Sequence, residues 1–238
     1  MDTSGYPGVF LVLAIGYMLV LILVLLGLRQ HQTKALPRVS FLTTLKRVAQ
    51  SKNILLIYVL SWILEFFYVI MIIYAPLLLL KQGFDWQQIG VIFTVMLIPF
   101  VLIQYPLGII ADKRWGEKEL LLAALLIIGI ATLLVGSMQT NNLILWAGVL
   151  FATRLGAAAL EVLRDSYFYK QIGPGDTDIV AFFRTARPIA NIVGAGISVL
   201  LLWFFPMESL FFAVGGVALL GSIAAYSLED SQPKVEEV

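Results

Sequence analysis

The hydrophobic positions of this chain gather in long, nearly unbroken runs rather than in an alternating pattern. A helix needs roughly 20 consecutive apolar residues to cross the hydrocarbon core of a bilayer. Seven runs are of this order, namely Gly8–Leu28, Asn53–Leu80, Gln87–Ile110, Glu119–Met138, Leu143–Leu163, Pro188–Phe205 and Leu210–Leu228. The pattern therefore predicts an all-α fold, a polytopic membrane bundle of seven transmembrane helices.

Composition agrees with a membrane protein and narrows its chemistry. Only 13% of the 238 residues are charged, whereas soluble domains carry about 25%. The chain has no Cys, and its single histidine, His31, falls in a polar loop, so we expect no disulfide, no metal site and no cofactor. Since no basic patch with interleaved aromatic residues is present, nucleic acid is not an expected partner.

Positive charges predict the orientation of the helices, because loops rich in Lys and Arg stay in the cytoplasm. Fourteen of the sixteen cations fall on one side if the N-terminus lies outside: Arg29, Lys34, Arg38, Lys46, Arg47, Lys52, Lys113, Arg114, Lys118, Arg164, Lys170, Arg184, Arg187 and Lys234. The opposite loops hold only Lys81, and Arg154 lies within a span. We therefore expect an integral protein of the cell (inner) membrane, with its N-terminus outside and its C-terminus in the cytoplasm.

Four segments follow from these boundaries. They are a first transmembrane helix (1–28), a cytoplasmic amphipathic linker (29–52), a six-helix transmembrane bundle (53–228) and a cytoplasmic tail (229–238). In the linker, Phe41, Leu42, Leu45 and Val48 recur at helical spacing, which favours a short helix lying in the headgroup region. The alternative is an unstructured basic linker.

A short charged turn separates the third and fourth runs. It reads Gly108-x-x-Ala111-Asp112-Lys113-Arg114-Trp115-Gly116-x-Lys118. This stretch resembles the signature loop of the major facilitator superfamily: a glycine, three residues, an aspartate, basic residues, a glycine and more basic residues. It departs from the commonest pattern in having one more residue in the basic stretch, and Glu117 stands where a cation is usual.

The resemblance implies that the seven runs are helices six to twelve of a twelve-helix transporter, that is, its C-terminal six-helix bundle with one preceding helix. It also implies that the turn is a cytoplasmic gate motif comprising Gly108, Asp112, Lys113, Arg114, Gly116 and Lys118. Asp112 follows the C-terminal end of its own helix, where the dipole disfavours a carboxylate, so it needs a partner on a neighbouring element. We expect Gly116 to permit the tight turn and Gly108 to permit close helix packing. The alternative is a plain turn held inside by its positive charge.

Two ionisable residues lie near the middle of predicted spans. Glu65 and Arg154 are costly to bury in a bilayer, which makes them functional candidates and natural partners for an ion pair. Tyr58, Trp62 and Tyr68 share a broad helical face with Glu65. We predict that these five residues serve substrate binding or proton coupling. The alternatives are a static buried ion pair and a polar pair that faces a missing half.

An inner charge cluster is expected near the cytoplasmic ends of the fifth and sixth predicted spans of this chain. Its members are Glu161, Arg164, Asp165, Arg184 and Arg187. The resemblance implies that Glu161 or Asp165 joins Asp112 and Arg114 in a charge relay that opens and closes the inner gate. The alternative is interfacial anchoring by snorkelling side chains.

The predicted function is a secondary active transporter, a symporter or antiporter that moves a small solute by alternating access. Its expected partners are the lipid bilayer, a small-molecule substrate, and a missing N-terminal half or a second copy. Sugars, organic anions and amphipathic drugs all suit a cavity with aromatic residues, one acid and one arginine. The alternatives are a non-transporting scaffold or partner subunit and a lipid-modifying membrane enzyme. The absence of GxSxG, HExxH and Walker motifs argues against an enzyme.

Overall fold

The computed structural model describes residues 5–27, 40–113, 116–173 and 175–229. These parts are almost entirely helical and contain no strand. The helices are α1 (Gly5–Gly27), α2 (Phe41–Gln50), α3 (Lys52–Lys81), α4 (Trp86–Lys113), α5 (Glu117–Ser137), α6 (Leu143–Gln171), α7 (Thr177–Arg184), α8 (Ala186–Phe204) and α9 (Glu208–Tyr226). Seven spans in the described parts are long and apolar enough to cross a membrane, so the predicted all-α polytopic fold is confirmed.

The chain divides into two units, Met1–Arg38 and Val39–Val238. The first contains α1, which carries no charged residue and is apolar around its whole circumference, as a lipid-embedded helix requires. The second contains α2 to α9 and holds the buried core.

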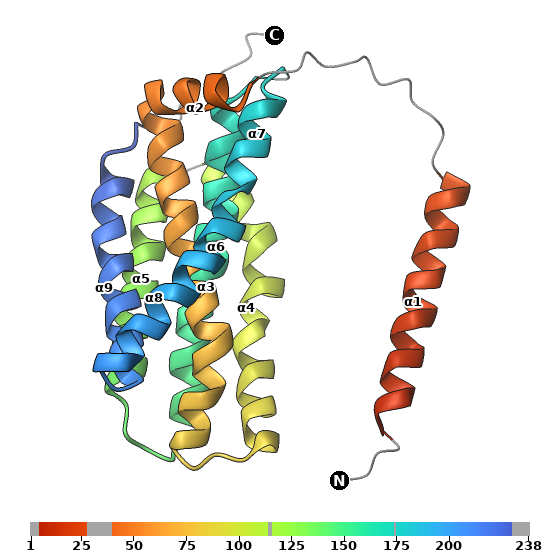
Figure 1. Ribbon diagram of the computed structural model, residues 1–238, viewed down its shortest axis with the longest axis vertical. Coiled ribbons are helices and arrows are strands. Elements are labelled where there is room, and N and C mark those ends of the chain that lie inside the picture. The colour runs from red at the N-terminus through yellow and green to blue at the C-terminus, as the bar shows by residue number, and fades with distance from the viewer. Residues whose placement is uncertain (1–4, 28–39, 114–115, 174, 230–238) are drawn as a thin grey trace. The chain divides into compact units, whose positions relative to one another are not determined.

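The second unit is a helix bundle in which α3 and α6 take central positions. Helix α5 packs against α6 and α9, α4 packs against α6, and α3 contacts α6, α8 and α9. Helix α2 lies across one end of this bundle and contacts α3 and α7 (Figure 1). We call this the α2 end; the last turn of α4, the first turn of α5, the last turn of α6 and the first turn of α7 also lie toward it (Figure 1).

Small residues bring the central helices into close contact, as expected for packing within lipid. A Cβ atom added at Gly156 of α6 would lie 2.8 Å from the Ala124 carbonyl oxygen of α5. Gly129 and Gly215 meet in the same way between α5 and α9. In contrast, a Cβ at Gly108 would meet no described atom of this chain within 4 Å, so the expected close packing at that glycine is not formed within the described residues. Helix α4 instead buries Ile92 and other residues nearer its start.

The linker helix forms as predicted, but its four apolar residues do not all lie on one exposed face. Phe41, Leu42 and Leu45 are exposed, whereas Val48 is buried together with Thr44. Val48 therefore does not share the outward apolar face expected from its spacing. The reason is that α2 rests on the bundle, so one side of the helix contacts protein and the other does not.

The sixth predicted span of the chain begins earlier than its apolar run indicates. Helices α7 and α8 together extend from Thr177, eleven residues before the predicted start at Pro188, and Thr185 separates them. Pro188 has no N–H to donate to the Arg184 carbonyl, so the regular helical bond is lost at this junction. The break places Arg187 in the first turn of α8.

Candidate functional site

Charged and aromatic side chains gather in cavities formed by α3, α4, α6, α7 and α8. A cavity of about 350 Å³, here called the charged cavity, is lined by Ser61, Glu65, Glu161, Arg164, Asp165, Tyr169, Phe183, Arg184, Ala186 and Arg187. A second, of about 290 Å³, here called the Arg154 cavity, is lined by Glu65, Tyr68, Ile72, Leu97, Phe100, Arg154, Glu161 and Arg187. Glu65, Glu161 and Arg187 line both, so the two cavities adjoin.

Glu65 is the carboxylate at which three helices meet. Its Oε1 lies 3.5 Å from Nη1 of Arg164 on α6, and its Oε2 lies 3.7 Å from Nε of Arg187 on α8. Arg164 also bonds its neighbour Asp165, with Nε donating to Oδ1 over 3.0 Å. Glu65 is only 9% exposed, so these arginines are its chief compensation for burial.

The predicted ion pair between Glu65 and Arg154 is therefore wrong. Arg154 precedes Arg164 by ten residues on α6, which places it about 15 Å further along the helix axis. Its guanidinium carbon lies 5.4 Å from the ring centroids of both Phe67 and Tyr68. Helical spacing identifies the face on which a residue lies but not its level against a neighbouring helix.

Tyr68 contacts both Glu161 and Arg154, which lie at different heights along α6. Its hydroxyl donates a hydrogen bond of 2.8 Å to Oε2 of Glu161, while its ring lies beside Arg154. Glu161 thus has a partner on α3, one turn along from Glu65. The arrangement places two carboxylates, one phenol and the two guanidinium groups of Arg154 and Arg187 around the Arg154 cavity.

Of the five residues predicted for substrate or proton coupling, Glu65, Tyr68 and Arg154 line a common cavity. Tyr58 and Trp62 line neither the charged cavity nor the Arg154 cavity. The Tyr58 hydroxyl lies 3.1 Å from the Thr185 hydroxyl at the α7–α8 break. Trp62 stacks on Phe66, one turn along the same helix.

The structure brings the five members of the inner charge cluster together. Glu161, Arg164, Asp165, Arg184 and Arg187 all line the charged cavity. Glu65 joins them there through its two arginine contacts, which the sequence interpretation did not foresee. Among the described residues, no three His, Cys, Asp or Glu side chains are placed to hold a metal ion.

The signature turn follows α4 and precedes α5 in the sequence. Asp112 and Lys113 end α4, but their side chains and the whole of Arg114 lie outside what the structure describes, so the predicted relay through them stays a prediction. Gly116 is the residue before α5 and has φ −56° and ψ 142°, angles that any residue adopts. The backbone angles of Gly116 therefore do not themselves require a glycine, and its expected role in the turn stays a prediction. The Lys118 ammonium lies 4.9 Å from the centroid of the Tyr226 ring on α9.

Glu117, the departure from the family pattern, has a structural role that the sequence interpretation missed. Its carboxylate is buried, accepts a hydrogen bond of 2.6 Å from the Ser166 hydroxyl and forms an ion pair of 2.9 Å with the Lys170 ammonium. Ser166 and Lys170 stand four residues apart on one face of α6, the spacing that would have indicated a shared partner. Glu117 thus connects the first turn of α5 to the last turns of α6.

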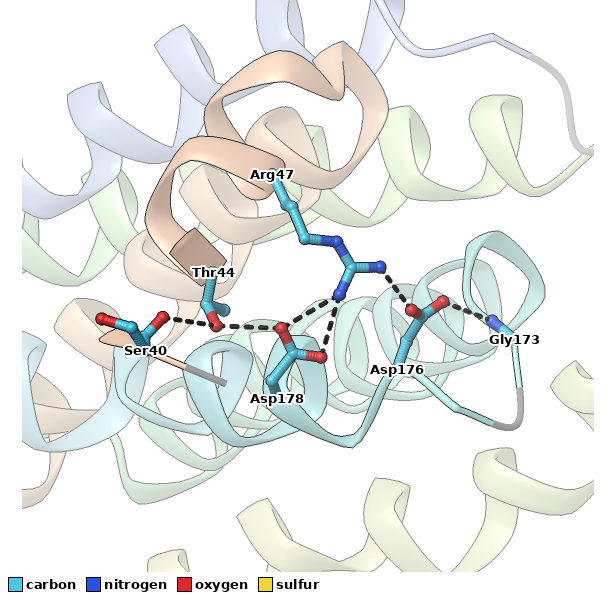
Figure 2. A network of polar contacts seen from close by, with 6 residues as sticks. All are labelled: Ser40, Thr44, Arg47, Gly173, Asp176 and Asp178. Atoms are coloured by element: carbon cyan, nitrogen blue, oxygen red, sulfur yellow. Dashed lines mark hydrogen bonds and ion pairs between the residues drawn. The ribbon is translucent and has the colours of Figure 1, made fainter. Parts of the chain in front are cut away.

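A second network, here called the clasp, joins α2 to the start of α7 (Figure 2). Nη1 of Arg47 lies 3.1 and 3.0 Å from the two carboxylate oxygens of Asp178, and its Nη2 pairs with Asp176. The Thr44 hydroxyl donates a bond of 2.9 Å to Asp178. The Gly173 backbone N–H, and after it the Arg47 guanidinium, hold the pKa of Asp176 below its ordinary value. The clasp was not predicted, since its partners lie about 130 residues apart in the sequence.

Comparison with known families agrees with this architecture. The model of the Major Facilitator Superfamily matches two overlapping stretches, residues 1–156 and 67–237, which together span almost the whole chain. Comparison with curated proteins gives no match. The chain is an integral membrane protein, and its described part contains seven helices long and apolar enough to span a membrane. It therefore belongs to the major facilitator superfamily, and this membership points to a transporter of that type.

Proposed function

We propose that the chain is the C-terminal half of a secondary active transporter that moves a small solute by alternating access. The observation that carries the proposal is the Arg154 cavity, where Glu65, Tyr68, Arg154 and Glu161 converge from α3 and α6 between otherwise apolar helices. Transporters built from repeated halves bind substrate near the middle of the membrane, where the halves meet. The face formed by α3, α4, α6 and α8 is our candidate for that meeting surface.

The exposure of this face supports a partner. The Arg187 side chain is 76% exposed although it lies within the span that runs from Thr177 to Phe204. A charged side chain in contact with hydrocarbon costs several kcal/mol, so lipid is an unfavourable cover. Water and a second polypeptide are favourable ones. We therefore assign an N-terminal half or a second copy of this chain to this face, and lipid to the remaining outer surface.

The contacts of Glu65 provide a way to couple the cavity to movement. Arg164 is buried and also bonded to Asp165, whereas Arg187 reaches Glu65 by a longer contact from an exposed position. Protonation of Glu65, or a competing anion near Arg187, weakens the contact between α3 and α8 first. In the proposed cycle this contact opens while Arg164 keeps α6 in place, which makes Glu65 the candidate proton-coupling residue.

The proposed orientation follows the positive charges. The α2 end carries Arg47, Lys118, Lys170 and Arg184, whereas the other end carries Lys81, paired with Glu208 at 2.7 Å. Cations are retained on the cytoplasmic side. We therefore place the α2 end in the cytoplasm of a cell membrane, with the inner charge cluster and the signature turn as the inner gate.

Cysteine accessibility tests the proposal, because the chain has no cysteine of its own. Ile72→Cys places a thiol in the Arg154 cavity, and Ile130→Cys places one on α5 away from both cavities; the native side chains are 63% and 54% exposed. We expect a water-soluble maleimide to label Ile72→Cys in intact cells and in inverted vesicles, and to label Ile130→Cys in neither. Labelling of Ile72→Cys from one side only, or as slowly as Ile130→Cys, would contradict alternating access.

A further inference from the structure

Arg154 is a buried cation that lacks an anionic partner. It is 4% exposed, and its Nε forms no hydrogen bond with any described residue. None of the carboxylates in the described part of the chain forms an ion pair with it. The rings of Phe67 and Tyr68 attract its charge but offer no hydrogen-bond acceptor along the edge of the guanidinium. A guanidinium desolvated in this way is unfavourable unless a ligand completes its hydrogen bonds.

The neighbouring acids are bound elsewhere and do not supply that ligand. Glu65 pairs with Arg164 and Arg187. Glu161 accepts the hydrogen bond of Tyr68, and Asp165 that of Arg164. The two carboxylates that line the Arg154 cavity thus have partners of their own.

The charges of the two adjoining cavities leave one positive charge in excess. Their arginines are Arg154, Arg164, Arg184 and Arg187, and their acids are Glu65, Glu161 and Asp165. A ligand with one negative charge therefore neutralises the site, whereas a dianion leaves it negative. Arginine binds a carboxylate through two parallel hydrogen bonds from the edge of its planar group, and Nε is one of the donors at that edge.

The remaining wall of the Arg154 cavity is apolar. Ile72, Leu97 and Phe100 line it opposite the polar groups, in a volume of about 290 Å³. Phe100 also contacts the Tyr68 ring, with centroids 6.4 Å apart. A hydrocarbon or aromatic body fits against these side chains, and a sugar with hydroxyl groups on every side does not.

We infer that Arg154 binds the carboxylate of a monoanionic organic substrate whose apolar body lies against Ile72, Leu97 and Phe100. This inference rests on the proposed function and gives its substrate class. It separates organic anions from the sugars and neutral amphipathic compounds that the same helices would otherwise accommodate. Arg154 acts in it as a binding residue, while Glu65 keeps its separate place in the contact between α3 and α8.

The test uses protection of the Ile72→Cys thiol, which lines the same cavity as Arg154. Vesicles that contain the full chain are treated with maleimide at neutral pH in the presence of benzoate, of its neutral counterpart benzamide, or of inorganic phosphate. We expect benzoate to slow labelling and the other two to have no effect. In the Arg154→Gln background, the same protection should require at least about tenfold more benzoate, since a hydrogen bond to a charged group is lost. Arg154→Lys, which keeps the charge but loses the planar fork, should lie between the two.

The outcomes separate this inference from the proposed function. Rapid two-sided labelling of Ile72→Cys without protection by benzoate would refute the carboxylate site and leave the transporter intact. Protection by phosphate alone would refute the monoanion. Equal protection in the presence of Arg154 and of Arg154→Gln would refute the role of Arg154. If Arg154→Gln does not fold, equal protection in Arg154→Lys leads to the same conclusion. Failure of the labelling pattern itself would overturn the proposed function first.

Discussion

Removing the two partners of the Glu65–Arg164 contact should have unequal effects on stability. In Arg164→Gln, the Glu65 carboxylate stays buried and keeps only Arg187, 3.7 Å away on an exposed side chain. In Glu65→Gln, Arg164 keeps its 3.0 Å bond to Asp165. The arginine variant thus leaves a poorly compensated buried charge, and the glutamate variant does not.

The magnitudes follow from this asymmetry. Breaking a buried ion pair by removing one partner costs about 3–5 kcal/mol. The contact here is long, at 3.5 Å, and Arg187 gives partial compensation, so we expect Arg164→Gln to cost about 3 kcal/mol of unfolding free energy. Glu65→Gln exchanges one charge-assisted contact for an amide and should cost about 1 kcal/mol.

Equilibrium unfolding of the full chain in mixed micelles measures both values. Arg184→Gln is the matched control, because Arg184 is an exposed arginine of the same cavity that forms no ion pair with a described residue; we expect a change within about 0.5 kcal/mol. The double variant of Glu65 and Arg164 should be less destabilised than the sum of the single variants. Equal costs for the two single variants, or strict additivity in the double variant, would refute the arrangement described.

Three further predictions concern packing and the clasp. Gly156→Ala should destabilise the bundle by about 1–3 kcal/mol, because its methyl group would press on the α5 backbone. The methyl group of Gly148→Ala, on the same helix, meets open space, so this variant should stabilise the bundle by up to about 1 kcal/mol. If the unfolding free energy changed in the same direction in both variants, the described packing would be contradicted. Arg47→Ala should speed hydrogen exchange of the α2 amides, whereas Lys46→Ala, the adjacent cation without a described ion pair, should not; identical exchange rates would exclude the clasp as a restraint. Because the pKa of Asp176 is lowered in the folded state, its contribution is complete above its ordinary value of 3.8 and is lost as the pH falls through the lower folded value. The protection of the α2 amides, that is, their exchange corrected for the intrinsic pH dependence of amide exchange, should therefore be constant from neutral pH to about pH 4 and decrease below it, and a transition near neutral pH would be inconsistent with Asp176.

The helices were predictable because each apolar run must match the thickness of a bilayer, a constraint that acts on single segments. The same constraint does not fix how far one helix is shifted along its axis relative to its neighbour. Glu65 and Arg154 each lie near the middle of a run, yet Glu65 meets Arg164, ten residues beyond the predicted partner. The side of a helix follows from its period, and the pairing of charges follows from packing that involves several helices at once.

The connections were harder to predict than the spans. Thr177–Arg184 contains Asp178 and Arg184 and so does not look like part of an apolar run, although it continues the span as α7. The charge of Asp178 is compensated by Arg47, far away in the sequence. A segment whose polarity is neutralised by a distant partner cannot be recognised from its own composition.

The clasp and the Glu65 contact are joined by one short stretch of chain. Asp178 lies in α7, the break at Thr185 follows, and Arg187 stands two residues further on, in the first turn of α8. Since Arg47 and the Tyr58–Thr185 contact hold this stretch against α2 and α3, a displacement of α2 acts on Arg187 through a few covalently linked residues. The Arg187–Glu65 contact is the longer of the two that Glu65 makes, so it is the one that such a displacement breaks first. The amphipathic linker is thereby placed to influence the same contact that the proposed transport cycle opens and closes.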